Sequence, residues 1–168
     1  MIRVKPINSD EVNVVIDLAK RIWPVSYATI LTHEQINNML DLIYSSENLQ
    51  NEIQNGHRFF GALLNDQPVG YASAYQDMNV LWLKKLYVLP ELQGQGTGKK
   101  LMNAVIAEFP LAKELRLLVN RDNLPAQQFY IRQQFTQIDE LPVKMGDFKF
   151  VDLVFSKKLD RKSTRLNS

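Results

Sequence analysis

The chain of 168 residues has no cysteine. Disulfide bonds, thiolate metal ligands and an acyl-cysteine intermediate are therefore excluded. Histidine is scarce as well, since His33 and His57 are the only two, and no serine stands in a G-x-S-x-G turn. We therefore expect neither a metal site nor a serine nucleophile that a histidine would activate.

The chain also lacks any apolar run near the ~20 residues that cross a membrane, and residues 1–6 do not form the apolar centre of a signal peptide. Its content of 45% hydrophobic and 23% charged residues is ordinary for a soluble globular protein. We expect one domain, a cytoplasmic location and no membrane partner.

The body of the chain has no surplus of positive charge. The formal net charge is +2, but residues 157–168 hold five Lys or Arg residues against one Asp, so residues 1–156 carry a net −2. This distribution argues against a nucleic-acid partner for the domain, although binding of RNA by residues 157–168 stays open. Residues 160–168 are polar and aperiodic, and we expect a basic tail that is disordered or that derives from a cloning vector.

The spacing of apolar residues predicts an antiparallel start followed by strands that alternate with helices. Strands are predicted at residues 2–6, 58–64, 69–75, 80–88, 115–119, 137–143 and 148–157. Helices are predicted from Ser9 to Pro24, after a capping box of Thr32 and Gln35, after a cap at Ser46 up to Gly56, from Gly98, and at residues 124–133. The order β-α-α-β-β-β-α-β-α-β-β indicates an α/β fold with helices on both faces of a mixed sheet.

Three glycines lie between the predicted strand at 80–88 and the helix that follows it. Gly94, Gly96 and Gly98 lack a Cβ, so backbone N–H groups there can approach a ligand closely. Because the first N–H groups of a helix have no partner within it and the helix dipole adds positive charge, this turn is suited to phosphate. Its spacing fits neither the dinucleotide-binding fingerprint nor the Walker loop.

The pattern that does fit is Q-x-x-G-x-G, formed by Gln93, Gly96 and Gly98. It resembles the pyrophosphate-binding motif of the GNAT superfamily of N-acetyltransferases, whose members bind acetyl-coenzyme A.

A second pattern lies downstream, where Asn123-x-x-Ala126-x-x-Phe129-Tyr130 resembles the second signature of the same superfamily. The order of elements is also similar to that superfamily over residues 1–159. The resemblance implies one GNAT domain with a mixed, mostly antiparallel twisted sheet.

The resemblance implies acetyl-CoA as co-substrate, with its pyrophosphate on the glycine turn and its pantetheine arm along the preceding strand. The residues implied at the turn are Gln93, Gly94, Gln95, Gly96, Thr97, Gly98 and Lys99. The pantetheine would pair with the backbone of Leu86, Tyr87 and Val88, and Pro90 would help to separate this strand from the one at 115–119.

Two residues have implied catalytic roles. The Val88 N–H group would polarise the thioester carbonyl, and Tyr130 would protonate the leaving thiolate, because a phenol with a pKa of about 10 keeps its proton at neutral pH. Asn123 and Phe129 would contact the coenzyme or pack beside it. For Tyr130, packing behind the coenzyme without a proton role stays open.

Two residues depart from the pattern of the superfamily. Lys84 stands where many relatives carry a glutamate as general base, so the base is unassigned, with an ordered water or Asp77 as candidates. Gln134 precedes Phe135 where glycine is usual, which indicates a slightly different turn.

The function expected from this resemblance is acetyl transfer from acetyl-CoA to a primary amine, by direct attack in a ternary complex. A small amine or a polyamine is favoured as acceptor; a protein N-terminus or lysine, an antibiotic amine, and a non-catalytic acyl-CoA sensor remain alternatives. The three early helices, with Trp23, Tyr27 and Ile30 between them, are expected to wall the acceptor pocket, although packing of Trp23 and Tyr27 in the core stays equally open. Acids that could contact a cation, or that could equally form a solvated face, are Glu34, Asp41, Glu47, Asp77 and Asp147. Oligomeric state stays open, with a homodimer as one option.

Overall fold

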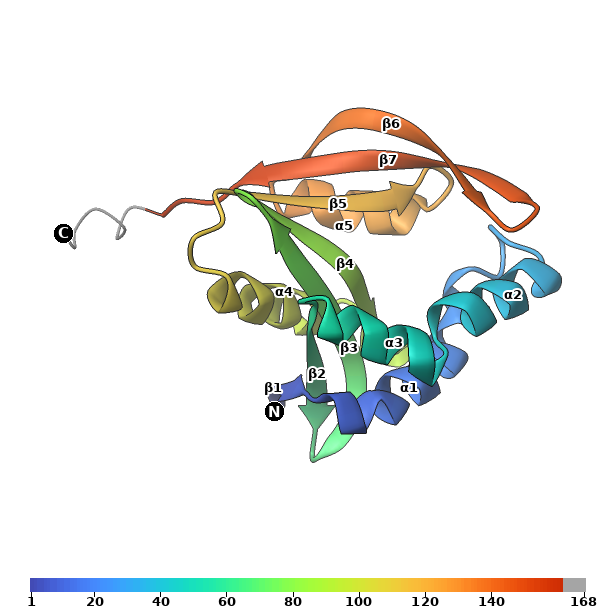
Figure 1. Ribbon diagram of the computed structural model, residues 1–168, viewed down its shortest axis with the longest axis horizontal. Helices are drawn as coiled ribbons and strands as arrows, with labels where there is room; N and C mark the ends of the chain where they lie inside the picture. The colour runs from blue at the N-terminus through green and yellow to red at the C-terminus, as the bar shows by residue number, and fades with distance from the viewer. Residues whose placement is uncertain (162–168) are drawn as a thin grey trace.

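The structure is a computed structural model that describes residues 1–161, so residues 162–168 of the predicted tail lie outside the described residues. Seven strands form one sheet in the order β1-β2-β3-β4-β5-β7-β6, and every neighbouring pair is antiparallel except β4 and β5 (Figure 1). The strands are β1 (Ile2–Ile7), β2 (Arg58–Leu64), β3 (Gln67–Asp77), β4 (Val80–Val88), β5 (Glu114–Asn120), β6 (Thr136–Met145) and β7 (Phe148–Lys158). The predicted α/β fold with a mixed, mostly antiparallel sheet is confirmed. The predicted order of elements is wrong by one helix, because three helices and not two lie between β1 and β2.

Helices cover both faces of the sheet. They are α1 (Val12–Ser26), α2 (His33–Ile43), α3 (Ser46–Gln54), α4 (Thr97–Glu108) and α5 (Leu124–Arg132), with short 3-10 turns η1 (Ser9–Glu11) and η2 (Pro90–Leu92). On the face of α1 to α3, the Tyr71 hydroxyl donates a hydrogen bond to the Tyr44 hydroxyl over 2.7 Å. On the other face, a Cβ at Gly70 would lie 3.3 Å from Leu101 of α4. Because neighbouring strand residues point to opposite faces, Gly70 and Tyr71 define the two layers.

Local capping explains where two of the helices begin. The Gln35 N–H group donates to Thr32 Oγ1 over 3.1 Å and the Thr32 N–H group donates to the Gln35 side chain over 2.9 Å, so the predicted capping box is confirmed. The prediction for α3 is wrong by one residue, because Ser45 and not Ser46 accepts the capping hydrogen bond from the Asn48 N–H group.

The predicted end of the first helix at Pro24 is also wrong, since α1 continues to Ser26. A proline removes only its own N–H group from the helix ladder. The N–H group of Tyr27 still donates to the carbonyl of Trp23 over 3.0 Å and closes the last turn.

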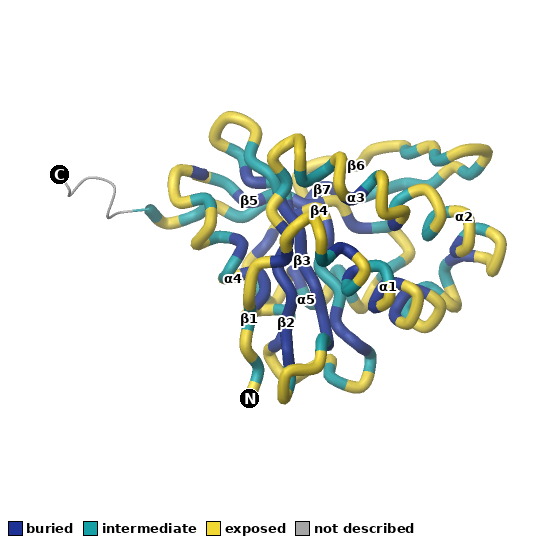
Figure 2. Tube along the Cα trace, turned by 60° about the horizontal axis from the view of Figure 1, so that its bottom comes forward, coloured by how far each residue is buried: buried dark blue, intermediate teal, exposed yellow. Residues whose placement is uncertain are grey.

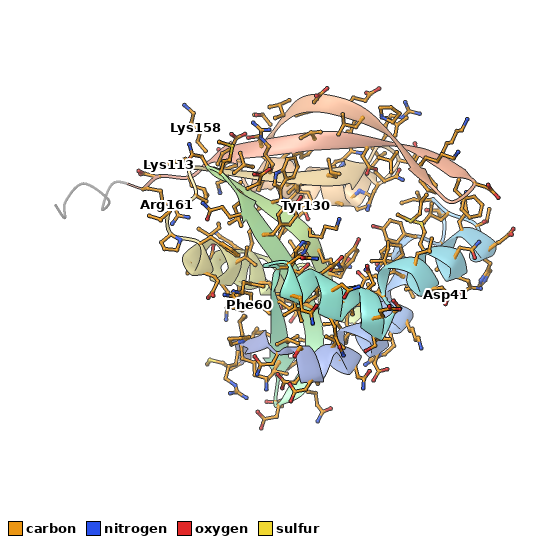
Figure 3. All side chains as sticks on the ribbon, viewed as in Figure 1. Asp41, Phe60, Lys113, Tyr130, Lys158 and Arg161 are labelled. Atoms are coloured by element: carbon orange, nitrogen blue, oxygen red, sulfur yellow. The ribbon has the colours of Figure 1, made fainter. Side chains whose placement is uncertain are left out.

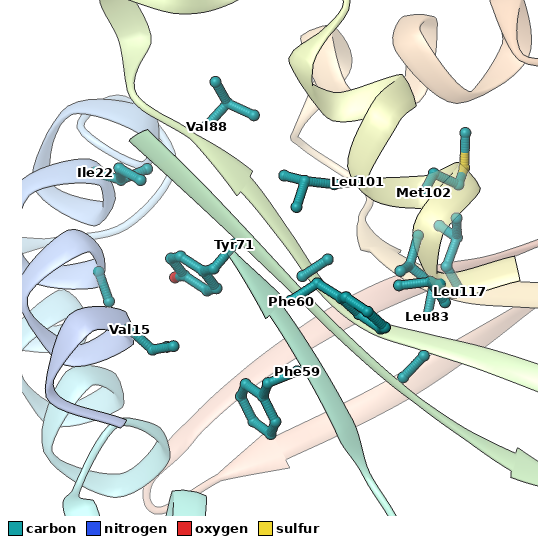
Figure 4. Packing of buried hydrophobic residues seen from close by; sticks show 14 of the residues in the cluster. Val15, Ile22, Phe59, Phe60, Tyr71, Leu83, Val88, Leu101, Met102 and Leu117 are labelled. Carbon is teal, nitrogen blue, oxygen red and sulfur yellow. The ribbon is translucent and has the colours of Figure 1, made fainter. Parts of the chain in front are cut away.

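The core lies on both sides of the central strands. Val15 and Ile22 of α1 pack on one face, and Leu101 and Met102 of α4 pack on the other (Figure 4). Figure 2 shows buried residues along the central strands and exposed residues on the outer faces of the helices. Each such side chain stabilises the fold by ~1.5–3 kcal/mol when buried. Among residues 1–161, no helix is long and apolar enough to cross a membrane.

The strands β4 and β5 separate partway along their length. Their parallel pairing covers only Val80 to Leu83 of β4, opposite residues 114–117 of β5. The register of β4 against β3 shifts at the same point, which leaves Lys84 as an unpaired bulge residue. A bulge bends its strand, so the separation begins at Lys84, before the chain reaches Pro90, which the sequence analysis expects to help it.

The start of the predicted tail is attached to the domain. The Arg161 guanidinium donates hydrogen bonds to the carbonyls of Ala112, Phe109 and Ile106 over 2.9, 3.0 and 3.3 Å (Figure 3). A cation beside the C-terminal end of α4 is also favoured by the helix dipole.

Candidate active site

A cavity of about 450 Å³ lies between the end of β4, the start of α4 and α5, and we call it the first cavity. It is lined by most of the residues that the sequence predicts for coenzyme binding: Leu86, Tyr87, Val88, Gln93, Gly94, Gly96, Thr97, Gly98, Asn123, Phe129 and Tyr130. Gln95 and Lys99 are not part of the lining. Tyr27 and Arg132, which the sequence does not assign to the coenzyme, do line it.

The glycine turn gives α4 an open N-terminus at this cavity. Gly96 is the N-cap with a φ of 86°, and Gly94 has a φ of 82°, both in the left-handed region that favours glycine. A Cβ at Gly98 would lie 3.4 Å from the Cζ atom of Phe129, so glycine also lets α5 come close. The N–H groups of the first turn, beginning with Thr97, have no carbonyl partner within the helix. This end of the cavity is therefore suited to an anion.

The last residues of β4 offer an open backbone edge. The Leu89 N–H group donates to the Val69 carbonyl over 2.9 Å, so these two residues form a bonded pair of the β3–β4 ladder. Because bonded and unbonded pairs alternate in an antiparallel ladder, Tyr87 pairs with β3, whereas the N–H groups of Leu86 and Val88 point toward the separation from β5. Of the three residues expected to pair with pantetheine, only Leu86 and Val88 can do so through their backbone.

A second cavity of about 370 Å³ adjoins the first. Its walls come from α1, α2, α5 and strands β3 to β7. Six residues line both cavities: Tyr27, Leu86, Tyr87, Asn123, Ala126 and Tyr130. The cavities therefore meet beside the end of β4 and the side chain of Tyr130.

Tyr130 lies at this junction, between the two halves of the sheet (Figure 3). Its ring packs edge-on against Phe129, Phe135 and Phe155, with centroid distances of 5.2, 5.4 and 6.4 Å. Burial raises the pKa of the Tyr130 phenol, and the neighbouring Tyr27 raises it further. The phenol therefore stays protonated at neutral pH.

Aromatic contacts also fix the wall between the cavities. The hydroxyl groups of Tyr27 and Tyr87 lie 3.0 Å apart and share a hydrogen bond. The Trp23 ring lies 4.6 Å from the Tyr27 ring and 5.6 Å from the Tyr87 ring, measured between centroids. Of the three residues predicted to wall an acceptor pocket, Trp23 and Tyr27 line the second cavity and Ile30 does not.

The acids that the sequence suggests for contact with a cation lie elsewhere, since none of them lines either cavity: Glu34, Asp41, Glu47, Asp77 and Asp147. The carboxylate in the second cavity belongs to Asp152 of β7, which the sequence prediction misses. The sequence feature that could have indicated a functional role for Asp152 is its position as the single acid within the otherwise apolar run at residues 150–155.

The structure shows where the two residues that depart from the superfamily pattern lie. Lys84, at the position expected to match the glutamate of relatives, lines the second cavity. Gln134 has a φ of 75°, in the left-handed region that favours glycine, so this turn is made here without the glycine that is usual in the superfamily. Asn123 is the N-cap of α5, where its Oδ1 atom accepts a hydrogen bond from the Ala126 N–H group over 3.2 Å.

Fold and site together define an acetyltransferase of the GNAT type. The family model of the acetyltransferase (GNAT) domain matches residues 27–156, and the chain belongs to this family. The predicted family and enzyme class are therefore confirmed.

Individual relatives agree with this membership. The chain is 27% identical over 168 residues to a spermidine N(1)-acetyltransferase of Thermoplasma acidophilum, covering 95% of this chain and 98% of the relative. It is also 29% identical over 146 residues to an uncharacterised N-acetyltransferase of Mycobacterium tuberculosis, and this match covers 84% of this chain and 94% of the relative. The crystal structure of the PaiA N-acetyltransferase of Thermoplasma acidophilum in complex with coenzyme A has a TM-score of 0.80 at 26% identity, covering 95% and 99%. That ligand agrees with the predicted co-substrate.

Proposed function

We propose that this protein transfers an acetyl group from acetyl-CoA to the primary amine of a small molecule, by direct attack in a ternary complex. The observation that carries the proposal is the junction of the two cavities at Tyr130 and the end of β4. A thioester held in the first cavity and an amine held in the second would meet there. Since the chain has no cysteine, an acyl-cysteine intermediate is not available.

The first cavity fits the coenzyme in three parts. The diphosphate would bind the N–H groups that begin α4, and Arg132 adds a cation to the same lining. The pantetheine would pair with the edge of β4 through Leu86 and Val88, in the manner of an added strand. The thioester then lies at the junction with the second cavity.

The reaction needs a donor for the developing oxyanion and a proton for the leaving thiolate. The Val88 N–H group, directed into the separation of β4 and β5, supplies the first; one such donor is worth ~10²–10³ in rate. The Tyr130 hydroxyl supplies the second, and its raised pKa keeps it protonated until the C–S bond breaks.

A small amine or a polyamine is the acceptor class that this proposal favours. The Thermoplasma relative named as a spermidine acetyltransferase supports it, as does a second cavity of about 370 Å³ with walls from several elements. A cavity of this size suits a small molecule.

A thiol-release assay with acetyl-CoA tests the proposal over a panel of polyamines, alkylamines, amino acids, aminoglycosides and peptides. We expect thiol release together with an acetylated small amine, and calorimetry should show binding of acetyl-CoA. A protein that binds acetyl-CoA but acetylates nothing would be a sensor, and acetylation of peptides alone would assign a protein acceptor. Either result would overturn the proposal.

A further inference from the structure

Asp152 lies in the middle of β7, which is bordered by β5 and β6. It pairs in register with Asn120 of β5 and with Leu141 of β6. All three residues line the second cavity. Because residues directly opposite each other across a sheet point to the same face, the Asp152 side chain lies on the face that borders the cavity.

The Asp152 side chain is half-buried, and within residues 1–161 its carboxylate makes no hydrogen bond or ion pair. Burial raises the pKa of this carboxyl group, because the ionised form loses hydration. A partly dehydrated carboxylate without a counter-charge is unfavourable, and a bound ammonium group would relieve that penalty.

Tyr27 connects Asp152 with the junction of the cavities. Burial raises the pKa of the Tyr27 phenol, the hydrogen bond with Tyr87 lowers it, and the negative charge of Asp152 raises it again. Asp152 therefore acts electrostatically on a residue that lines both cavities, on the side where an acceptor amine would approach the thioester.

The rest of the second cavity offers little to a second positive charge. Its titratable side chains are Tyr27, Tyr75, Lys84, Tyr87, Tyr130 and Asp152. Among these lining residues of the described chain, Asp152 is the one carboxylate and Lys84 the one cation. A second ammonium group would lose its hydration against apolar side chains such as Trp82, or would approach Lys84.

We propose that Asp152 binds the ammonium group of the acceptor and removes its proton, and that the acceptor carries this one ammonium group on an apolar body. The inference rests on the proposed acetyl transfer and narrows its acceptor class from small amines and polyamines to monoamines, so the acceptor named for the Thermoplasma relative is not carried over to this chain. It also supplies the base that β4 lacks, since Lys84 stands at the bulge where an acid would otherwise serve.

The proton balance of the step is complete. The Asp152 carboxylate takes one proton from the ammonium group, and the neutral nitrogen forms a bond to the thioester carbon. The C–S bond then breaks, and the thiolate receives the Tyr130 proton. Tyr130 regains a proton that the new amide nitrogen loses, and Asp152 releases its proton to solvent. The products are the amide, free coenzyme A and one proton.

The first test compares the Asp152→Asn variant with Asp147→Asn, which changes an exposed acid outside both cavities. We expect Asp152→Asn to lower kcat/KM for the amine about 100-fold at neutral pH, with the affinity for acetyl-CoA unchanged. The loss should shrink as the pH rises, because the variant depends on amine that is already neutral in solution. Unchanged kcat/KM, or a loss that stays constant with pH, would contradict the role of Asp152 as base.

The second test needs no variant and compares pentylamine with cadaverine, which differ only by a second terminal amine. We expect wild type to prefer pentylamine by about tenfold in kcat/KM, and spermidine to be poorer still. Equal or better use of cadaverine or spermidine would overturn the monoamine assignment.

The two proposals fail in different ways. If wild type binds acetyl-CoA but acetylates no amine, the proposed function is wrong, and the inference on Asp152 is wrong with it. If wild type acetylates amines and Asp152→Asn keeps the full rate at every pH, only the assignment of Asp152 is wrong.

Discussion

The two cavities of this protein are built in different ways. The first is made largely of one stretch of the chain, from the end of β4 through the glycine turn into α4, and α5 closes it. The second takes single side chains from α1, α2, α5 and five strands. Backbone N–H groups are the same whatever side chains they carry, whereas a wall of single side chains changes with each substitution. A side-chain substitution should therefore change the shape of the second cavity more than it changes the N–H groups of the first.

The largest expected loss of stability comes from breaking the ion pair between Lys85 and Glu52. The buried Lys85 ammonium lies 2.6 Å from Glu52 Oε1 and joins β4, a strand that lines the second cavity, to α3. Burial lowers the pKa of Lys85, and Glu52 opposes that shift. Replacing Lys85 with Met removes the ammonium partner of the Glu52 carboxylate and leaves it only Asn48 and His57 nearby, and we expect a loss of about 3 kcal/mol in the free energy of unfolding. Urea denaturation measures it.

The matched control replaces both partners, Lys85→Met with Glu52→Gln, which removes the charges together. We expect this double variant to recover most of the lost stability, because no buried charge remains unpaired. Both variants should keep the acetyl-CoA affinity of wild type while folded, since neither residue lines the first cavity. A weaker acetyl-CoA affinity would mean that the two cavities are not independent.

Tyr130 lies where the cavities meet, so its replacement tests the junction. We expect Tyr130→Phe to lower kcat by ~10²–10³-fold, because the thiolate loses its proton donor, and to leave the Kd for acetyl-CoA almost unchanged. Since burial raises the pKa of Tyr130, the acid form persists to high pH, and wild type should show no loss of rate from Tyr130 below pH ~10. Rate and calorimetric measurements across pH check both statements.

Tyr71→Phe serves as the control for removing a buried hydroxyl group. Tyr71 donates to the Tyr44 hydroxyl over 2.7 Å and lines neither cavity. We expect a loss of ~1–3 kcal/mol in stability and an unchanged kcat. If Tyr71→Phe lowered kcat as much as Tyr130→Phe, the effect at Tyr130 would be one of packing.

The same contrast explains how much could be predicted from the sequence. The glycine turn at Gly96 and the capping box at Thr32 are local, because the residues that make each feature are close together in the chain. Asp152 reaches the second cavity only because β7 inserts between β5 and β6. No short sequence motif predicts this strand order, because it depends on pairing between distant parts of the chain. The bulge at Lys84 likewise depends on how β4 pairs with β3.

The smallest expected effect concerns the first cavity and is tested at Gly96. Replacing Gly96 with Ala forces a side chain into the left-handed region at a φ of 86°, which costs ~1–2 kcal/mol of stability. The strain also disturbs the N–H groups that begin α4, so we expect the affinity for acetyl-CoA to fall about tenfold, equivalent to ~1.4 kcal/mol. Calorimetry on the folded variant measures this affinity.

Gly56→Ala is the matched control, because Gly56 also has a left-handed φ, of 98°, and a Cβ there likewise meets no atom within 4 Å. Both variants should lose similar stability. Only Gly96→Ala should lose acetyl-CoA affinity, since Gly56 precedes β2 and lines neither cavity. Equal affinities in the two variants would show that the backbone angle at Gly96 serves folding alone, and that the anion is held by side chains such as Arg132 instead.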